Sequence, residues 1–125
     1  MKPIIVSNSK ILTVLSYISP VNNIWAITIW PFVFCKGEMD DKTINHESIH
    51  IEQYNDLFVI GFFIVYVLDW IHGRIKYRSN FSGYRSAGEK AYCRTRAEQE
   101  SYYNEENVNY IIGRKRYRWL KEYKV

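Results

Sequence analysis

The sequence predicts an α+β protein in which a small antiparallel sheet with an edge strand packs on two long helices. The segment 24–35 is rich in β-branched and aromatic residues, which are typical of strands. Two later stretches, 41–60 and 89–112, contain neither Gly nor Pro and predict the helices. The chain has 125 residues, 47% of them apolar and 24% charged. That is enough for one hydrophobic core, so we expect a single domain over residues 1–125.

The strands are expected in the first third of the chain. Residues 4–18 fit either a strand or a short helix, and the Ser, Pro and Asn residues of 19–23 indicate a turn. The segment 24–35 is the strongest strand because it is rich in Ile, Trp, Phe and Val. Pro31 interrupts it and has no backbone N–H to donate, so we expect an edge strand or a bulge.

The first long helix is expected to begin with Asp41 or Thr43 as its N-cap. It meets no Gly or Pro before Gly61 and can extend to Gly73. Residues 57–68 are twelve consecutive apolar or Gly residues, whereas a membrane-spanning helix needs roughly 20. We therefore expect residues 57–71 to form a buried helix, and membrane anchoring through this segment is the alternative that the sequence leaves open.

The C-terminal half is expected to be helical after a polar loop at 77–88. Residues 89–112 form the second long helix, with Gly113 as its C-terminal cap. Residues 114–125 hold six cations and one acid, and they predict a short basic amphipathic helix that buries Trp119 and Leu120. Its charged face is either simply solvated or bound to acidic protein or nucleic acid. Acidic partners within the chain are Glu100, Glu105 and Glu106.

One motif indicates chemistry: His46-Glu47-Ser48-Ile49-His50, in which two of the three histidines of the chain lie four residues apart. On a helix this spacing places both imidazoles on one face, where they can bind one Zn²⁺. Glu47 lies beside them, where it can take a proton from a metal-bound water. The plainer alternative is two histidines on a half-buried helix, paired with Glu47 and solvent.

A zinc site needs a third protein ligand, and position along the chain alone does not choose it. On a helix, Glu98 shares a face with Tyr102, which is either a hydroxyl donor to the reaction or a packing residue. Gln53 continues the motif face and can orient a ligand, and His72 is more typical of a helix end. The candidates for the third ligand are Asp69, His72, Glu89, Glu98 and Glu100.

The segment 43–50 resembles the extended HExxH motif of zincin peptidases. Glu98-Gln99-Glu100-Ser101-Tyr102 is similar to the second-helix motif of the gluzincin branch, which implies Glu98 as the third ligand. Residues 24–112 also resemble small zincin-like proteins of gut bacteria and their tailed phages. The resemblance implies a minimal zincin-like fold with zinc as cofactor, His46, His50 and Glu98 as metal ligands, and Glu47 as catalytic base.

Two functions are expected from this pattern. The first is a minimal zinc metallopeptidase that pairs an extended peptide with the edge strand at 24–35. The alternative is a structural or assembly component of a phage particle, such as a ring or tail protein, with the metal site intact or relict. Either function is compatible with homo- or hetero-oligomeric assembly and with a cytoplasmic or virion location.

The two cysteines and the N-terminal segment bear on disulfide formation and on secretion. Cys35 and Cys93 are too few for a disulfide scaffold or a cysteine zinc finger, and the sequence leaves a single disulfide between them open. The apolar start at residues 4–6 is followed by polar residues, and no small-residue cleavage site follows. We therefore expect no secretory signal peptide.

Overall fold

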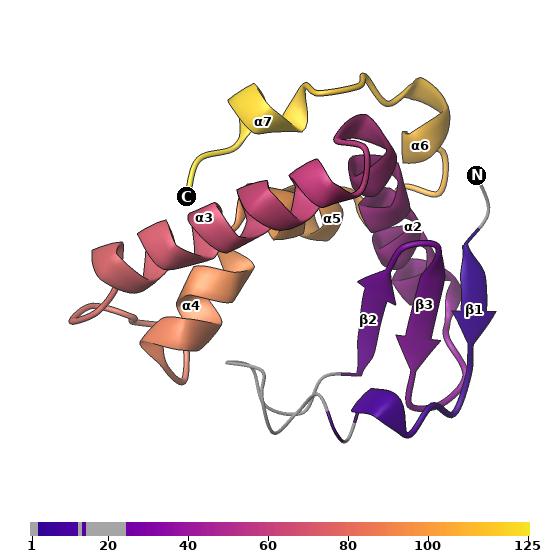
Figure 1. The fold of residues 1–125 in the computed structure, drawn as a ribbon, viewed down its shortest axis with the longest axis horizontal. Coiled ribbons are helices and arrows are strands. Elements are labelled where there is room, and N and C mark those ends of the chain that lie inside the picture. The colour runs from indigo at the N-terminus through magenta and orange to yellow at the C-terminus, as the bar shows by residue number, and fades with distance from the viewer. Residues whose placement is uncertain (1–2, 13, 15–24) are drawn as a thin grey trace.

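The computed structural model describes residues 3–12, 14 and 25–125. Within these residues the protein is α+β, with six helices and one three-stranded mixed sheet (Figure 1). The strands are β1 (Ile4–Val6), β2 (Ala26–Ile29) and β3 (Phe32–Cys35). The helices are α2 (Asp41–Asp56), α3 (Ile60–Lys76), α4 (Ala87–Cys93), α5 (Arg96–Asn104), α6 (Tyr110–Gly113) and α7 (Trp119–Glu122). The turn predicted at 19–23 lies outside the described residues, as do residues 13 and 15–18 of the segment 4–18.

The sheet has the order β1-β3-β2, so β2 is an edge strand. β2 and β3 are antiparallel, and Ile29 pairs with Phe32 around a tight turn at Trp30 and Pro31. The single strand predicted at 24–35 is therefore two strands, because Pro31 lies in the turn rather than in a ladder. β1 runs parallel to β3, so the predicted antiparallel sheet is wrong in this pair. Parallel strands need a long connection between them, and residues 7–31 between β1 and β3 provide one.

Helix α2 begins one residue earlier than predicted and ends well before Gly73. Asp40 is the N-cap, and its carboxylate accepts the N–H of Thr43 at 2.8 Å. At the other end, Phe58 and Val59 have positive φ angles of 56° and 67°. This conformation is costly for bulky L-residues, and it separates α2 from α3. The two helix axes are bent by 111°, so the prediction of one continuous helix is wrong.

Burial of side chains at the junction explains the bend. Leu57 and Val59 pack against a core cluster that includes Tyr54 and Phe62. The carbonyl of Tyr54 accepts the N–H of Leu57 and that of Val59, at 3.3 Å and 2.8 Å. The bend also lets Phe62 of α3 pack on the Tyr54 ring, with the ring centroids 3.9 Å apart.

The predicted second long helix at 89–112 is also wrong, because it is three helices, α4, α5 and α6. Ser86 caps α4 by accepting the N–H of Glu89, and Thr95 caps α5 by accepting the N–H of Glu98. Each pair has the Ser/Thr-x-x-Glu spacing of a helix start. This capping signal is present in the sequence and indicates the break before α5.

Helix α3 is far more exposed than predicted. Phe62, Asp69 and Gly73 are its buried residues, and Gly73 lies so close to α4 that an added Cβ would be 2.9 Å from Ala91. Many of its large apolar side chains are exposed, so the prediction of a buried helix at 57–71 is wrong. No single described helix is long and apolar enough to cross a membrane; α2 and α3 pass that test as a bent pair, by length and composition alone.

The basic tail folds back onto α2 and α5. α7 is only four residues long, so the helix predicted over 114–125 is shorter than expected. Trp119 is buried as predicted, and Leu120 is partly buried against the same core cluster. The Arg114 guanidinium forms buried ion pairs with Asp56 of α2 and Glu100 of α5, at 2.7 Å and 3.0 Å. Glu100 is thus an acidic partner inside the chain.

Candidate metal centre

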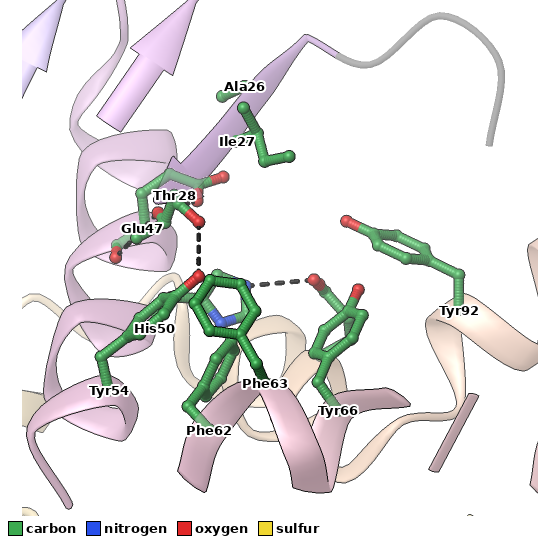
Figure 2. A pocket seen from close by; sticks show the side chains of 11 residues that line it. Ala26, Ile27, Thr28, Glu47, His50, Tyr54, Phe62, Phe63, Tyr66 and Tyr92 are labelled. Atoms are coloured by element: carbon green, nitrogen blue, oxygen red, sulfur yellow. Dashed lines mark hydrogen bonds and ion pairs between the residues drawn. The ribbon is translucent and has the colours of Figure 1, made fainter. Parts of the chain in front are cut away.

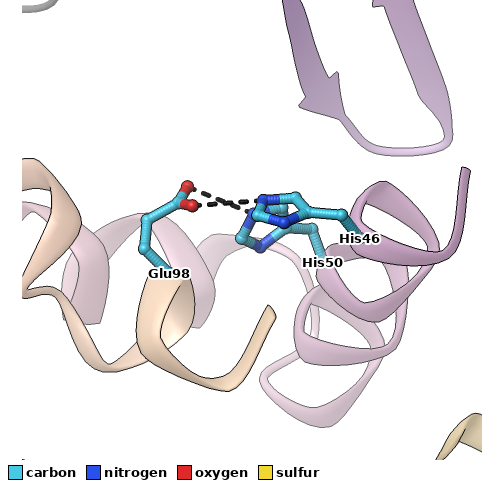
Figure 3. A group of neighbouring side chains, drawn as sticks. All are labelled: His46, His50 and Glu98. Atoms are coloured by element: carbon cyan, nitrogen blue, oxygen red, sulfur yellow. Dashed lines mark ion pairs between the residues drawn. The ribbon is translucent and has the colours of Figure 1, made fainter. Parts of the chain in front are cut away.

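His46 and His50 lie one turn apart on α2, and Glu98 faces them from the first turn of α5 (Figure 3). The Nε2 atoms of His46 and His50 are 3.3 Å and 3.1 Å from the two carboxylate oxygens of Glu98. All three side chains are buried. The fold therefore brings together the two motif histidines and the carboxylate that the resemblance implies as the third ligand, although 48 positions separate His50 from Glu98.

Each imidazole is oriented by a hydrogen bond on its other nitrogen. His46 Nδ1 lies 2.6 Å from the carboxylate of Glu105, and His50 Nδ1 lies 2.8 Å from Oε1 of Gln53. Both partners are acceptors, so each Nδ1 carries the proton in the neutral ring. The lone pair of each Nε2 is then directed at Glu98, which is the arrangement that a metal ligand needs.

The amide orientation of Gln53 is itself determined by the fold. Its Nε2 donates to the carbonyl of Ala97 at 3.0 Å and to Glu100 at 2.8 Å. With both amide hydrogens used on α5, Oε1 is the atom left to face His50. The role expected for Gln53 as an orienting residue agrees with this geometry. From the sequence, Glu105 is expected on the helical face of Glu98 and as an acidic partner of the tail, and its contact with His46 depends on the turn after α5.

That turn is attached to α2 by Asn45. The Asn45 side-chain amide donates to three backbone carbonyls, those of Asn104, Glu105 and Asn107, at 3.3, 2.8 and 2.9 Å. Asn45 immediately precedes His46, so one short segment of α2 both holds the turn and presents the first histidine. The Glu105 carboxylate is positioned in this way beside His46.

The donor set fits a metal ion. One ligand atom from each of His46, His50 and Glu98 can be chosen so that all lie within 4.8 Å of one another. Glu98 Oε2 is buried and has no hydrogen-bond partner, although His46 Nε2 is nearby. Buried polar atoms without a partner are rare in folded proteins, and a cation between the three groups would satisfy this one. Two imidazole nitrogens and one carboxylate could therefore hold a metal ion here.

Without a metal the cluster is a buried ion pair. Burial opposes the charge on His50, but attraction to Glu98 outweighs it and raises the pKa of His50 to about 9. Burial also opposes the charge on Glu98, yet the neighbouring His50 and His46 hold the pKa of that carboxyl well below its usual range. The pKa of His46 is raised as well, because Glu98 outweighs the effect of burial.

Glu47 lies on the pocket side of the cluster. Thr28 of β2 donates its hydroxyl to the Glu47 carboxylate at 2.6 Å. The hydroxyl of Tyr54 donates to the Thr28 carbonyl at 2.9 Å, so α2 is attached to β2 at two points. Glu47, His50 and Glu98 all line one pocket between β2 and α3 (Figure 2). A carboxylate held beside the candidate ligands can accept a proton from a bound water.

The rest of that pocket is aromatic. Phe62, Phe63 and Tyr66 of α3 and Tyr92 of α4 form its walls, and Ala26 and Ile27 of β2 close the opposite side (Figure 2). Burial and then the charge of Glu98 raise the pKa of Tyr66 and of Tyr92 well above 10, so both phenols stay protonated and can donate. Local sequence indicates neither tyrosine, because the bend after α2 turns α3 with Tyr66 toward the site, and the packing of α4 on α3 brings Tyr92.

The other candidate ligands are engaged elsewhere. Asp69 binds Arg96 at 2.8 Å, Glu100 binds Arg114, and Glu89 accepts the N–H of Arg85. His72 is exposed on α3. Tyr102 packs edge-on against the His46 ring, with ring centroids 4.7 Å apart, and it lines a different pocket from Glu47. Its geometry is that of a packing residue. Cys35 and Cys93 are both free thiols.

Comparisons with protein-family models, with curated proteins and with solved structures found no match to this chain.

Proposed function

We propose that this chain is a zinc-dependent hydrolase of the minimal metallopeptidase type, with a zincin-like arrangement of its site. His46, His50 and Glu98 are the zinc ligands, and Glu47 is the general base. The observation that carries the proposal is the convergence of two oriented Nε2 atoms on a buried carboxylate, one oxygen of which accepts no hydrogen bond. Zinc is the metal we propose because three-ligand sites with imidazole and carboxylate donors are typical of catalytic zinc.

Zinc, when bound, would polarise a substrate carbonyl and make a water molecule acidic enough to lose a proton near neutral pH. Glu47 takes that proton and returns it to the leaving amine, while the hydroxyl of Thr28 keeps the carboxylate aimed into the pocket. Tyr66 or Tyr92 donates a hydrogen bond to the oxygen that becomes negative as water attacks. The aromatic walls exclude bulk water and strengthen these interactions.

The proposed substrate is an extended peptide. β2 is an edge strand, and its residues Ala26–Thr28 line the pocket beside Glu47. No strand within residues 3–12, 14 and 25–125 pairs with its outer edge. An extended chain can add to such an edge through backbone hydrogen bonds, which would lead a peptide bond past the metal centre.

The first test is metal content and ligand replacement. We expect purified protein to contain one zinc per chain by elemental analysis, and Glu98→Gln to lose it. Glu106→Gln is the matched control, because Glu106 is a highly exposed carboxylate on the turn after α5, and it should retain zinc. Absence of zinc in the wild-type protein, after refolding with zinc in excess, would refute the proposal.

The second test separates hydrolysis from a structural role. Glu47→Gln should keep zinc and lose cleavage of a fluorogenic peptide mixture, whereas a phage-particle component would cleave nothing in either form. Tyr66→Phe and Tyr92→Phe show which tyrosine is the hydroxyl donor. Removing the hydroxyl of the donor should lower kcat, and removing the other hydroxyl should leave kcat unchanged. Zinc binding without any hydrolysis would favour the assembly alternative.

A further inference from the structure

Helix α3 has a continuous apolar surface that the described part of the chain leaves exposed. Ile60 and Leu68 are 72% and 60% exposed, and the other members are comparably accessible. Contiguous exposed apolar surface of this kind marks an interaction site more often than a passive surface. We call it the α3 stripe, and its members are Ile60, Ile64, Val67, Leu68, Ile71 and Ile75.

The stripe is one face of an amphipathic helix. Its members recur every three or four residues, which keeps them on one side of α3. The buried residues Phe62, Asp69 and Gly73 lie on the opposite side by the same spacing, and this side packs against the core and α4. α3 therefore buries one face within the protein and presents a second, fully aliphatic face to its surroundings.

The charged side chains on and next to α3 indicate what kind of partner binds this face. Asp69 is the only acid of the helix, and it is buried and bound by Arg96 through two nitrogens, Nε at 2.9 Å and Nη2 at 2.8 Å. Arg74 is exposed at the C-terminal end of the stripe, with its guanidinium 5.6 Å from the ring centroid of Trp70. Arg78, one turn further, is exposed as well. The surface of α3 thus combines aliphatic side chains with cations and offers no exposed carboxylate.

We propose that the α3 stripe binds the surface of a lipid bilayer that contains anionic headgroups. α3 lies in the plane of the interface, its aliphatic face enters the acyl boundary, and Arg74 and Arg78 bind headgroup phosphates. The proposal concerns a surface distinct from the metal centre and does not depend on the proposed hydrolase activity.

A second copy of the chain fits the same face less well. Packing two α3 helices antiparallel would place Arg74 of each against the isoleucines of the other, and packing them parallel would place Arg74 against Arg74. In both arrangements Arg74 would find no carboxylate on the facing helix, because the only acid of α3 is buried. A layer of lipid phosphates supplies the missing negative charge where the stripe ends.

The test is flotation of the full chain with vesicles of phosphatidylcholine alone or mixed with an equal part of phosphatidylglycerol. We expect binding to the mixed vesicles and its loss in the double variant Ile64→Ser/Leu68→Ser. The control is Val108→Ser/Ile112→Ser, because these residues lie outside α3 and are 71% and 85% exposed, and it should bind as the wild type does. Arg74→Gln/Arg78→Gln should weaken binding roughly 20-fold to 30-fold and remove most of its salt dependence, since each basic residue at an anionic surface contributes about a fivefold change.

Circular dichroism and melting temperature show whether each variant is folded. Unchanged melting of Ile64→Ser/Leu68→Ser supports an exposed stripe, whereas a large drop would show that another part of the chain covers it and would overturn the proposal. Absence of wild-type binding to the mixed vesicles would overturn it as well. A dimer in sedimentation equilibrium that only the stripe variant dissociates would assign the face to a second copy instead.

Discussion

Replacing Arg114 by Met should destabilise the protein strongly, because this guanidinium joins two buried carboxylates from different helices. Its nitrogens lie 2.7 Å from Asp56 Oδ2 and 3.0 Å from Glu100 Oε2, with further contacts to both carboxylates at 3.3 Å and 3.1 Å. Met has similar volume and no charge, so the variant removes the cation without opening a large cavity.

The magnitude follows from what remains after the change. Asp56 keeps the indole N–H of Trp119 at 3.0 Å and the largely solvated cation of Arg116 at 3.5 Å. Glu100 keeps neutral donors, the hydroxyl of Tyr110 at 2.7 Å and the amide of Gln53 at 2.8 Å. A solvated arginine and neutral donors do not fully compensate two buried negative charges. Removing one partner of a buried ion pair typically costs about 3–5 kcal/mol, a large share of the roughly 5–15 kcal/mol that holds a domain folded.

Urea denaturation at neutral pH measures this loss, and Arg116→Met is the matched control. Arg116 also approaches Asp56, at 3.5 Å, but its side chain is 58% exposed, so its removal should cost less than about 1 kcal/mol. Adding Asp56→Asn and Glu100→Gln to the Arg114 variant should recover part of the stability, because no unpaired charge remains. Equal losses for the two Arg variants, or a loss below about 1 kcal/mol for Arg114→Met, would refute the reasoning.

Four further predictions concern the metal centre, its pH dependence and the packing of α3. Gln53→Met should weaken zinc affinity by about 10-fold to 100-fold, measured by competition with a chromophoric chelator, because His50 loses the acceptor at 2.8 Å that orients it; unchanged affinity would contradict this role. Zinc affinity should rise about tenfold or more per pH unit up to pH 9, since the pKa of His50 is raised to about 9 and zinc must displace its proton. In metal-free protein, protonated His50 contributes its full stabilisation below pH 6.5, and this contribution is lost as the pH rises through about 9 because the pKa is raised in the fold. Melting temperatures measured without zinc should fall over the same pH range. Gly73→Ala should cost about 1–3 kcal/mol because its Cβ would be 2.9 Å from Ala91, whereas Gly113→Ala, with open space around it, should melt close to the wild type.

Local sequence identified much of the candidate site because its chemistry is encoded at helical spacing. Two histidines four residues apart must share a face of α2 wherever that helix packs, and Gln53 follows on the same side. Local sequence also contained capping signals at Ser86 and Thr95 that indicate the break before α5. The long-helix prediction overlooked those signals by relying on the absence of Gly and Pro.

The junction between α2 and α3 could not be predicted locally. Nothing in the composition of 57–59 requires a positive φ at Phe58 and Val59, and intrinsic preference opposes it. The bend exists because it buries Leu57 and Val59 against Tyr54 and the rest of the core cluster, a gain that only the assembled fold supplies.

By itself the sequence determined the α+β class, the helix that presents His46 and His50, and the position of Glu47 beside them. The tertiary structure decided which carboxylate faces the histidines, because Glu98, Glu100 and Asp69 are chemically equivalent and only packing sends the latter two to arginines. It also decided that α3 turns one apolar face outward. A run of apolar residues specifies a hydrophobic helix, but whether its second face is covered depends on how many other elements the chain can place around it.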